Sequence, residues 1–236
     1  MTPVAPVADW RQAAVRRWLD EGRAAGMSYL LRHYALRCDP RLVEPSARTV
    51  VSVALPYDMK PSFAPDALRL SRYALGSDYH DVVKNRLRQM VRLLGFDPAC
   101  DGRICCDTAP VDERYWAWRT GVGRWLRSGL ISVRGHGTCV VLGEWLAPFP
   151  MAEAEVAAVT VPPLPPAEEC LRCGRCLAAC PGGALGGGGL DARRCLSYLT
   201  IEHRGPLPDH DEHTPARRAA LASCFYGCDR CAEVCP

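Results

Sequence analysis

The feature that most constrains this chain is a run of closely spaced cysteines near its C-terminus. The run has two, two and three residues between successive cysteines and ends in a proline: Cys170, Cys173, Cys176, Cys180 and Pro181. A second group repeats the last part of the pattern: Cys228, Cys231, Cys235 and Pro236. Fourteen cysteines in a chain whose N-terminus shows no secretory signal favour thiolate ligation of metal in a reducing compartment over a disulfide framework.

The C-x2-C-x2-C-x3-C-P spacing is typical of segments that bind two [4Fe–4S] clusters. Three thiolates on a tight loop reach one cluster, and the fourth cysteine is carried toward the other. The second group is one thiolate short, and the spacing leaves two candidates, Cys195 and Cys224. Two zinc sites are the alternative, because C-x2-C pairs also bind tetrahedral zinc. The other cysteines receive no predicted role: Cys38, Cys100, Cys105, Cys106 and Cys139.

Composition limits the classes of protein to which the chain can belong. The 236 residues are 48% hydrophobic and 23% charged, enough for one sizeable domain and a small one. A net charge of +3 creates no strong field for nucleic acid or membrane, and no apolar run reaches the roughly 18 residues of a membrane span. We therefore predict a cytoplasmic protein with no membrane association. Val161–Pro166, rich in proline, predicts an extended linker between domains 1–160 and 161–236.

Hydrophobic periodicity predicts an α+β fold, with a mixed sheet in the first domain and a ferredoxin-like second domain. Expected helices run from Asp9 to about Gly26, from Ser77 or Asp78 onward, and over Val111–Arg119. Expected strands cover Arg48–Leu55, Ile104–Cys106 and Thr138–Leu142. The second of these strands would deliver Asp107 to a loop.

Six segments, taken in order with the cysteine run, resemble the epoxyqueuosine reductase family. They are Gly26–Leu30, Arg48–Tyr57, Arg72–His80, Asp107–Arg114, Leu190–Gly205 and Tyr226–Cys231. The resemblance implies reduction of epoxyqueuosine to queuosine at the wobble position of tRNA, with cobalamin and two [4Fe–4S] clusters as cofactors. The common corrinoid motif D-x-H-x-x-G is absent, which fits a family whose cobalamin has no protein histidine as lower ligand.

The resemblance also implies specific site residues. The first cluster would take Cys170, Cys173, Cys176 and Cys235. The second would take Cys180, Cys195, Cys228 and Cys231, so that Cys195 supplies the missing thiolate. The implied cobalamin contacts are Arg37, Ser71, Asp107, Ile131, Leu142, Glu202, Cys228 and Asp229. The implied tRNA contacts are His203, Arg204 and Pro206.

Asp107 is the predicted proton donor, because loss of the epoxide oxygen as water requires protons and a carboxylic acid beside the corrin could supply them. The alternative is that Asp107 only caps the helix that begins near Val111.

A second pair of alternatives concerns the stretch from residue 114 to 134. Its arginines and tryptophans could bind and stack RNA, or the tryptophans could lie in the core: Arg114, Arg119, Arg124, Arg127, Arg134, Trp116, Trp118 and Trp125.

The chain departs from the family at two points. Arg127 and Ser128 stand where the family usually has lysine and asparagine, and the sequence ends at Pro236 without the helical-repeat domain of many members. We expect a monomer that receives electrons from a ferredoxin or flavodoxin. Two other functions remain open: a corrinoid iron–sulfur reductase of a small molecule, like the reductive dehalogenases, and a non-catalytic electron-transfer module.

Overall fold

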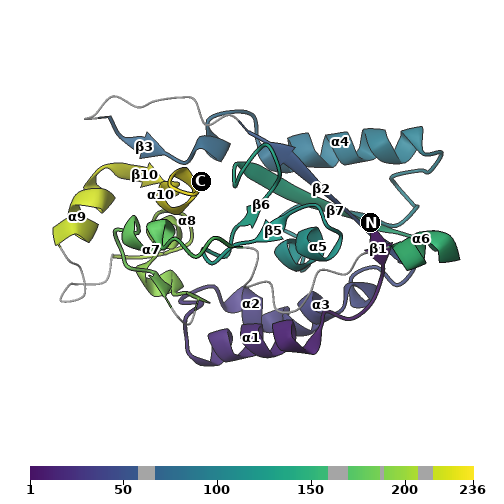
Figure 1. The fold of residues 1–236 in the computed structure, drawn as a ribbon, viewed down its shortest axis with the longest axis horizontal. Coiled ribbons are helices and arrows are strands. Elements are labelled where there is room, and N and C mark those ends of the chain that lie inside the picture. Colours follow the sequence, from purple (N-terminus) through teal and green to yellow (C-terminus); the bar gives the residue numbers. More distant parts are fainter. Residues whose placement is uncertain (58–66, 159–169, 187–188, 207–214) are drawn as a thin grey trace.

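The computed structural model describes residues 1–57, 67–158, 170–186, 189–206 and 215–236. The linker expected at residues 161–166 lies outside these residues, so the domain boundary at residue 160 stays a prediction. Figure 1 shows a central sheet with helices on both sides and the cysteine-rich segment packed against one end of it. No helix among the described residues is long and apolar enough to cross a membrane.

The central sheet has four strands in the order β1-β2-β7-β4, all antiparallel. Their bounds are Thr2–Pro3, Thr49–Pro56, Val140–Ala147 and Arg103–Cys105, respectively. The strands expected near residues 48–55 and 104–106 are confirmed. The strand expected at 138–142 was placed too short, because β7 continues along β2 as far as Ala147, opposite Thr49.

The expectation of a mixed sheet is wrong for the main sheet. The chain between β4 and β7 contains a helix and a short hairpin, which return it in the opposite direction. The only parallel pair among the described residues joins β3 (Arg69–Leu70) to β10 (Cys224–Tyr226). Two further two-stranded ribbons are formed by β5 with β6 and by β8 with β9: Arg124–Trp125, Ile131–Ser132, Leu185–Gly186 and Gly189–Leu190.

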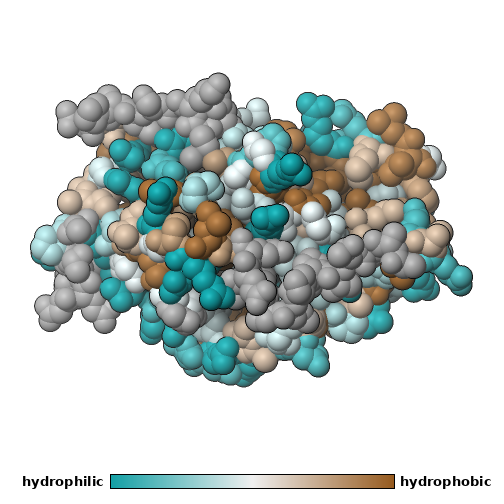
Figure 2. Space-filling model, viewed as in Figure 1, coloured by the Kyte–Doolittle hydropathy of each residue, from teal (hydrophilic) through white to brown (hydrophobic). Residues whose placement is uncertain are grey.

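Helix α4 (Tyr79–Leu93) confirms the predicted second helix, and Asp78 caps it by accepting a hydrogen bond from the His80 backbone N–H. Its buried face packs across β7, where Gly143 permits a close approach, because a Cβ there would clash with Val83. Its exposed C-terminal end coincides with a concentration of apolar residues in Figure 2, and Leu93 is 88% exposed.

The first helix is shorter than expected. α1 (Asp9–Asp20) ends six residues before Gly26, in a turn at residues 21–26, and α2 (Ser28–Arg32) and α3 (Tyr34–Cys38) follow. Helix α5 (Glu113–Arg119) confirms the third predicted helix. The remaining helices are short: α6 (Glu153–Ala158), α7 (Arg175–Ala178), α8 (Leu196–Ile201), α9 (Pro215–Ala222), α10 (Arg230–Glu233) and the 3₁₀ turns η1 (Pro40–Leu42), η2 (Arg72–Ala74) and η4 (Ala192–Arg194).

The main core lies between α5 and the sheet. Trp116 and Trp118 are each 1% exposed and pack with Val50 and Leu146 in one buried cluster. These two tryptophans therefore belong to the core, and the alternative that they stack on RNA bases is wrong. Trp125 is partly buried at the edge of the same cluster, where the Arg11 guanidinium lies 4.7 Å from its ring centroid.

Replacing Trp118 by alanine should lower the free energy of unfolding by about 3–5 kcal/mol, because a large buried side chain leaves a cavity. Denaturant unfolding of anaerobically purified protein measures this. Arg127→Ala, at an exposed position in the same stretch, is the matched control and should stay within about 0.5 kcal/mol of wild type. A small loss for Trp118→Ala would contradict the core assignment.

Candidate active site and cluster-binding segment

Asp107 lies in a loop that begins directly after β4, as the sequence predicted. Its backbone has a φ of 57°, in the left-handed region that few residues other than glycine adopt. The Glu113 carboxylate holds this backbone by accepting a hydrogen bond from the Asp107 N–H. Asp112, not Asp107, caps α5, since its side chain accepts from the Tyr115 N–H. The Asp107 carboxylate is therefore left for another role.

The Asp107 side chain is 59% exposed and faces His80, whose Nε2 lies 3.2 Å from Asp107 Oδ2. The His80 Nδ1 lies 2.7 Å from Asp78 Oδ1. Both neighbours are acceptors, so the geometry favours the doubly protonated ring. Partial burial lowers the pKa of His80, but the hydrogen bonds to Asp78 and Asp107 outweigh it and leave the pKa raised. The site thus places a cation beside the predicted acid.

A cavity of about 180 Å³ opens beside Asp107. Its polar wall consists of Tyr57, Tyr73, Tyr79, Asp107 and Glu113, and its apolar wall of Val140, Val141 and Leu142. Burial, followed by the charge of Asp107 and a hydrogen bond to it, raises the pKa of Tyr79. The tyrosines therefore stay neutral donors around the acid.

Only some of the implied cobalamin contacts gather here. Asp107 and Leu142 line the cavity, whereas Arg37 and Glu202 lie nearby around Tyr29. The Tyr29 hydroxyl lies 3.2 Å from Glu202 Oε1. Burial, then Glu202, raises the pKa of Tyr29 to about 12, and the charges of Arg37 and Asp107 also act on it.

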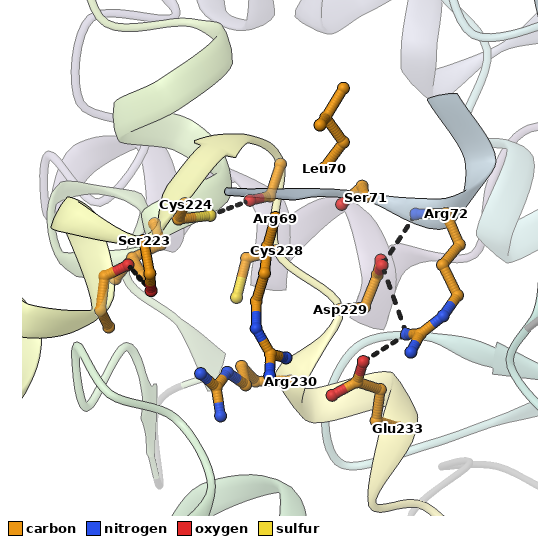
Figure 3. Close-up of a pocket in the computed structure, with 13 residues that line it drawn as sticks. Arg69, Leu70, Ser71, Arg72, Ser223, Cys224, Cys228, Asp229, Arg230 and Glu233 are labelled. Atoms are coloured by element: carbon orange, nitrogen blue, oxygen red, sulfur yellow. Dashed lines mark hydrogen bonds and ion pairs between the residues drawn. The ribbon is translucent and has the colours of Figure 1, made fainter. Parts of the chain in front are cut away.

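The other implied cobalamin contacts do not line this cavity, although the charge of Asp229 acts on Tyr57 and Tyr73, which do. Ser71 and Ile131 are buried, 3% and 4% exposed. Ser71, Cys228 and Asp229 line a second, smaller pocket of about 30 Å³, shown in Figure 3. There Asp229 accepts the Arg72 N–H at 2.8 Å and pairs with the Arg72 guanidinium.

The cysteines fall into two groups that cross between the two sequence clusters. Burial, and then the charges of Cys228, Cys195 and Cys180, raise the pKa of Cys231. Burial, and then the charges of Cys170, Cys176 and Cys173, raise the pKa of Cys235. Cys235 is thus close to the first run, and Cys180 close to the second group.

Cys224 lies near Cys228 but is differently engaged, since its thiol donates to the Gly227 carbonyl oxygen at 2.6 Å. Within the part of the chain that the structure describes, no three cysteine, histidine or acidic side chains converge tightly enough to hold one metal ion.

The implied tRNA contacts form one surface turn after α8. His203 Nε2 lies 2.9 Å from the Pro206 carbonyl oxygen, which makes the turn compact, and Arg204 and Pro206 are exposed. The residues that surround Asp107 were not among the predicted site residues, although two of the segments that carry the family resemblance contain several of them: Tyr73, Tyr79, His80 and Glu113. Tyr29 and Tyr57, in two other such segments, were not predicted either.

Comparison with known proteins shows the family of this chain. The family model "Epoxyqueuosine reductase QueG, DUF1730" matches residues 37–108, and "4Fe-4S double cluster binding domain" matches residues 169–236. The epoxyqueuosine reductase of Synechococcus sp. (strain CC9605) is 38% identical over 99% of this chain and 68% of its own length. The chain belongs to the epoxyqueuosine reductase family.

Solved members of the family share the fold described above. An epoxyqueuosine reductase crystallised with an epoxyqueuosine-modified tRNA-Tyr stem loop superposes with a TM-score of 0.79 at 28% identity, over 99% of this chain and 59% of that one. The Streptococcus thermophilus enzyme gives 0.78 at 25% identity, over 99% and 60%. The Vibrio cholerae relative is 34% identical over 95% of this chain and 59% of its own length. The chain thus spans about 60% of several relatives that it matches.

Membership in the family sharpens one prediction about the cysteines. Cys195→Ala should lower the iron content of anaerobically reconstituted protein by about half, because one of two clusters loses a ligand. Cys224→Ala is the matched control, since it removes a neighbouring thiol outside the proposed ligand sets, and its iron content should equal wild type. Colorimetric analysis of the iron bound by each variant tests the ligand assignment. Equal loss in both variants, or loss only in the second, would show that the ligand assignment is wrong.

Proposed function

We propose that this chain reduces epoxyqueuosine to queuosine in the anticodon of tRNA, with electrons passing through two [4Fe–4S] clusters to cobalamin. The observation that carries the proposal is the position of Asp107: its carboxylate stands at the edge of an open cavity, with the cysteine-rich segment packed on the same end of the sheet. An acid, a cavity and a source of electrons are the three parts that reductive loss of an epoxide oxygen needs.

The relatives support the substrate class. One solved relative is described as bound to an epoxyqueuosine-modified tRNA stem loop, and a Bacillus subtilis relative as having its catalytic aspartate loop swung out of the active site. In this chain, the loop of Asp107 is the matching candidate, because it joins β4 to α5 and ends beside the cavity. The exposed turn of His203, Arg204 and Pro206 is the proposed contact for the RNA.

The two groups of cysteines fit two clusters. We assign Cys235 to the group around Cys170 and Cys195 to the group around Cys180, in agreement with their proximity. A cluster ligand has to reach the metal as a thiolate, and each group supplies four half-buried or exposed thiols. Within this proposal a ferredoxin- or flavodoxin-type protein of the cytoplasm is the electron donor, and the enzyme acts as a monomer.

Cobalamin fits the residues beside the cavity. Val140, Val141 and Leu142 present an apolar edge against which a flat macrocycle can pack, and Asp107 faces the same space. Tyr29, Arg37 and Glu202 would hold its polar side chains nearby. When bound, cobalamin would supply two-electron reduction at carbon.

The reaction consumes two electrons and two protons and releases the epoxide oxygen as water. Asp107 would donate a proton to that oxygen as the carbon–oxygen bonds break. His80, doubly protonated, lies at hydrogen-bonding distance from Asp107 and would supply the second proton to the leaving oxygen through the Asp107 carboxylate. An electron-transfer module needs no acid beside an open cavity, whereas either kind of reductase would use one.

Asp107→Asn should retain iron and cobalamin but lose about a hundred- to ten-thousand-fold in turnover, because an amide accepts hydrogen bonds yet cannot protonate the leaving oxygen. The measurement is single-turnover conversion of an epoxyqueuosine-modified stem loop by chemically reduced protein, followed by nucleoside mass spectrometry. Asp97→Asn, at an exposed turn before β4 where the carboxylate accepts the Ala99 N–H, is the control and should match wild type.

Two results would count against the proposal. Turnover by the Asp107→Asn variant close to wild type would remove the acid role. Absence of any queuosine from the fully loaded wild-type protein would remove the proposed function itself and leave the small-molecule reductase and the electron-transfer module as the alternatives.

A further inference from the structure

Glu144 is an acid in an unusual place. It lies on β7 between Ser52 of β2 and Cys105 of β4, and it is 0% exposed. Among the described residues, neither of its carboxylate oxygens receives a hydrogen bond from a donor. An ionised carboxylate in such surroundings is strongly unfavourable, since burial removes its water and nothing replaces it. Burial, followed by the charges of Glu113 and Asp112, raises the pKa of Glu144 well above its usual range.

The neighbour within hydrogen-bonding reach of Glu144 is the Glu113 side chain. Two ionised carboxylates have acceptors only, so a hydrogen bond between them requires that one carries a proton. Glu113 already accepts the Asp107 N–H and lies in the field of Arg37 and Arg114. The negative charge is therefore better placed on Glu113, and the proton on Glu144.

We propose that Glu113 and Glu144 share one proton and that this pair holds the Asp107 loop in position beside the cavity. Glu144 donates to Glu113, and Glu113 in turn accepts the backbone N–H of Asp107. The two glutamates are positioning residues that act through the loop. Their role in holding a catalytic acid rests on the proposed function, whereas the pair itself does not.

The pair makes the loop sensitive to pH. Burial raises the pKa of Glu113 and raises that of Glu144 well above the usual carboxyl range, so the shared proton on Glu144 is lost only at neutral to alkaline pH. Two buried negative charges then repel, Glu113 moves away, and the left-handed backbone of Asp107 loses its anchor.

Several other groups surround the pair and are part of this balance. Asp107 and Asp112 add negative charge, Arg37 and Arg114 oppose it, and Cys105 lies opposite Glu144. Cys106 lies near both glutamates, and Lys84 of α4 acts on the two cysteines. None of these groups can donate the missing hydrogen bond to Glu144 in the described geometry.

The direction in which stability should change with pH follows from the raised pKa values. A carboxyl whose folded-state pKa is raised stabilises the fold fully below its unfolded pKa, and this contribution is lost as the pH rises through the folded value. Wild type should therefore become less stable, and its loop less protected, between about pH 5 and pH 9. Glu144→Gln should remove both effects, because the amide N–H donates permanently to the Glu113 carboxylate.

The test is hydrogen exchange, read by mass spectrometry, of the peptide that contains Asp107 in the full, iron-loaded chain. After correction for the intrinsic pH dependence of exchange, wild type should lose about tenfold or more of its protection from pH 6 to pH 9, and Glu144→Gln less than about twofold. Glu155→Gln, at an exposed site on α6, is the control and should follow wild type. Infrared spectra at pH 7 should show the C=O band of a buried protonated carboxyl in wild type and in the control, and not in Glu144→Gln.

Equal pH dependence in wild type and Glu144→Gln, or an unchanged carboxyl band, would overturn the proposal. If Glu144→Gln fails to fold, the wild-type profile decides, since constant protection from pH 6 to pH 9 would equally overturn it. Neither measurement involves RNA or turnover. A chain with this pH signature that converts no epoxyqueuosine would therefore refute the proposed function and leave the glutamate pair standing.

Discussion

The parallel pairing of β10 with β3 is the contact on which the rest of the arrangement depends. It joins the cysteine-rich segment to the sheet domain through the Ser71 N–H, which donates to the Tyr226 carbonyl at 2.7 Å. Gly227 follows in left-handed backbone and lies so close to Ser71 that any side chain would clash. A second connection, from the Ala192 N–H to the Arg23 carbonyl at 2.9 Å, fixes the opposite side. The thiols are thereby kept at the end of the sheet where Asp107 lies.

The position of Asp107 at that end depends on two neighbouring groups, one in the interior and one at the surface. Asp107 is largely exposed, so its position cannot come from packing of its own side chain. Glu113 fixes its backbone from the interior, and His80 faces its carboxylate from the surface. Because one neighbour holds the backbone and the other faces the side chain, the carboxylate stays accessible to a substrate while the loop keeps a strained conformation. Strained backbone of this kind is common at functional sites, where it lowers the stability of the fold.

Much of the fold could be predicted from the sequence, because periodicity and cap residues are local signals. The helix after Asp78 and the strand that ends at Pro56 follow from such signals. The direction of the strands could not be predicted, since it depends on how the chain returns between β4 and β7. The strand expected at residues 138–142 ended before Glu144, so the burial of this carboxyl in the sheet could not be predicted. Buried Trp116 and Trp118 could not be distinguished from exposed tryptophans without the tertiary contacts of α5.

For the site, spacing alone indicated clusters but left Cys195 and Cys224 open. In the structure both thiols lie near Cys228, and they differ in that Cys195 also acts on Cys231 whereas the Cys224 thiol donates to the Gly227 carbonyl oxygen. The central claim of this account is that the clusters and the cavity beside Asp107 form one electron path through bound cobalamin. The most direct test is the electron paramagnetic resonance spectrum of cob(II)alamin added to the iron-loaded protein, at a potential at which the clusters are reduced and the cobalt remains Co(II). The account predicts a bound cobalt signal broadened by the spin of a neighbouring reduced cluster. The unbroadened spectrum of free cobalamin, recorded while both clusters are reduced, would contradict it.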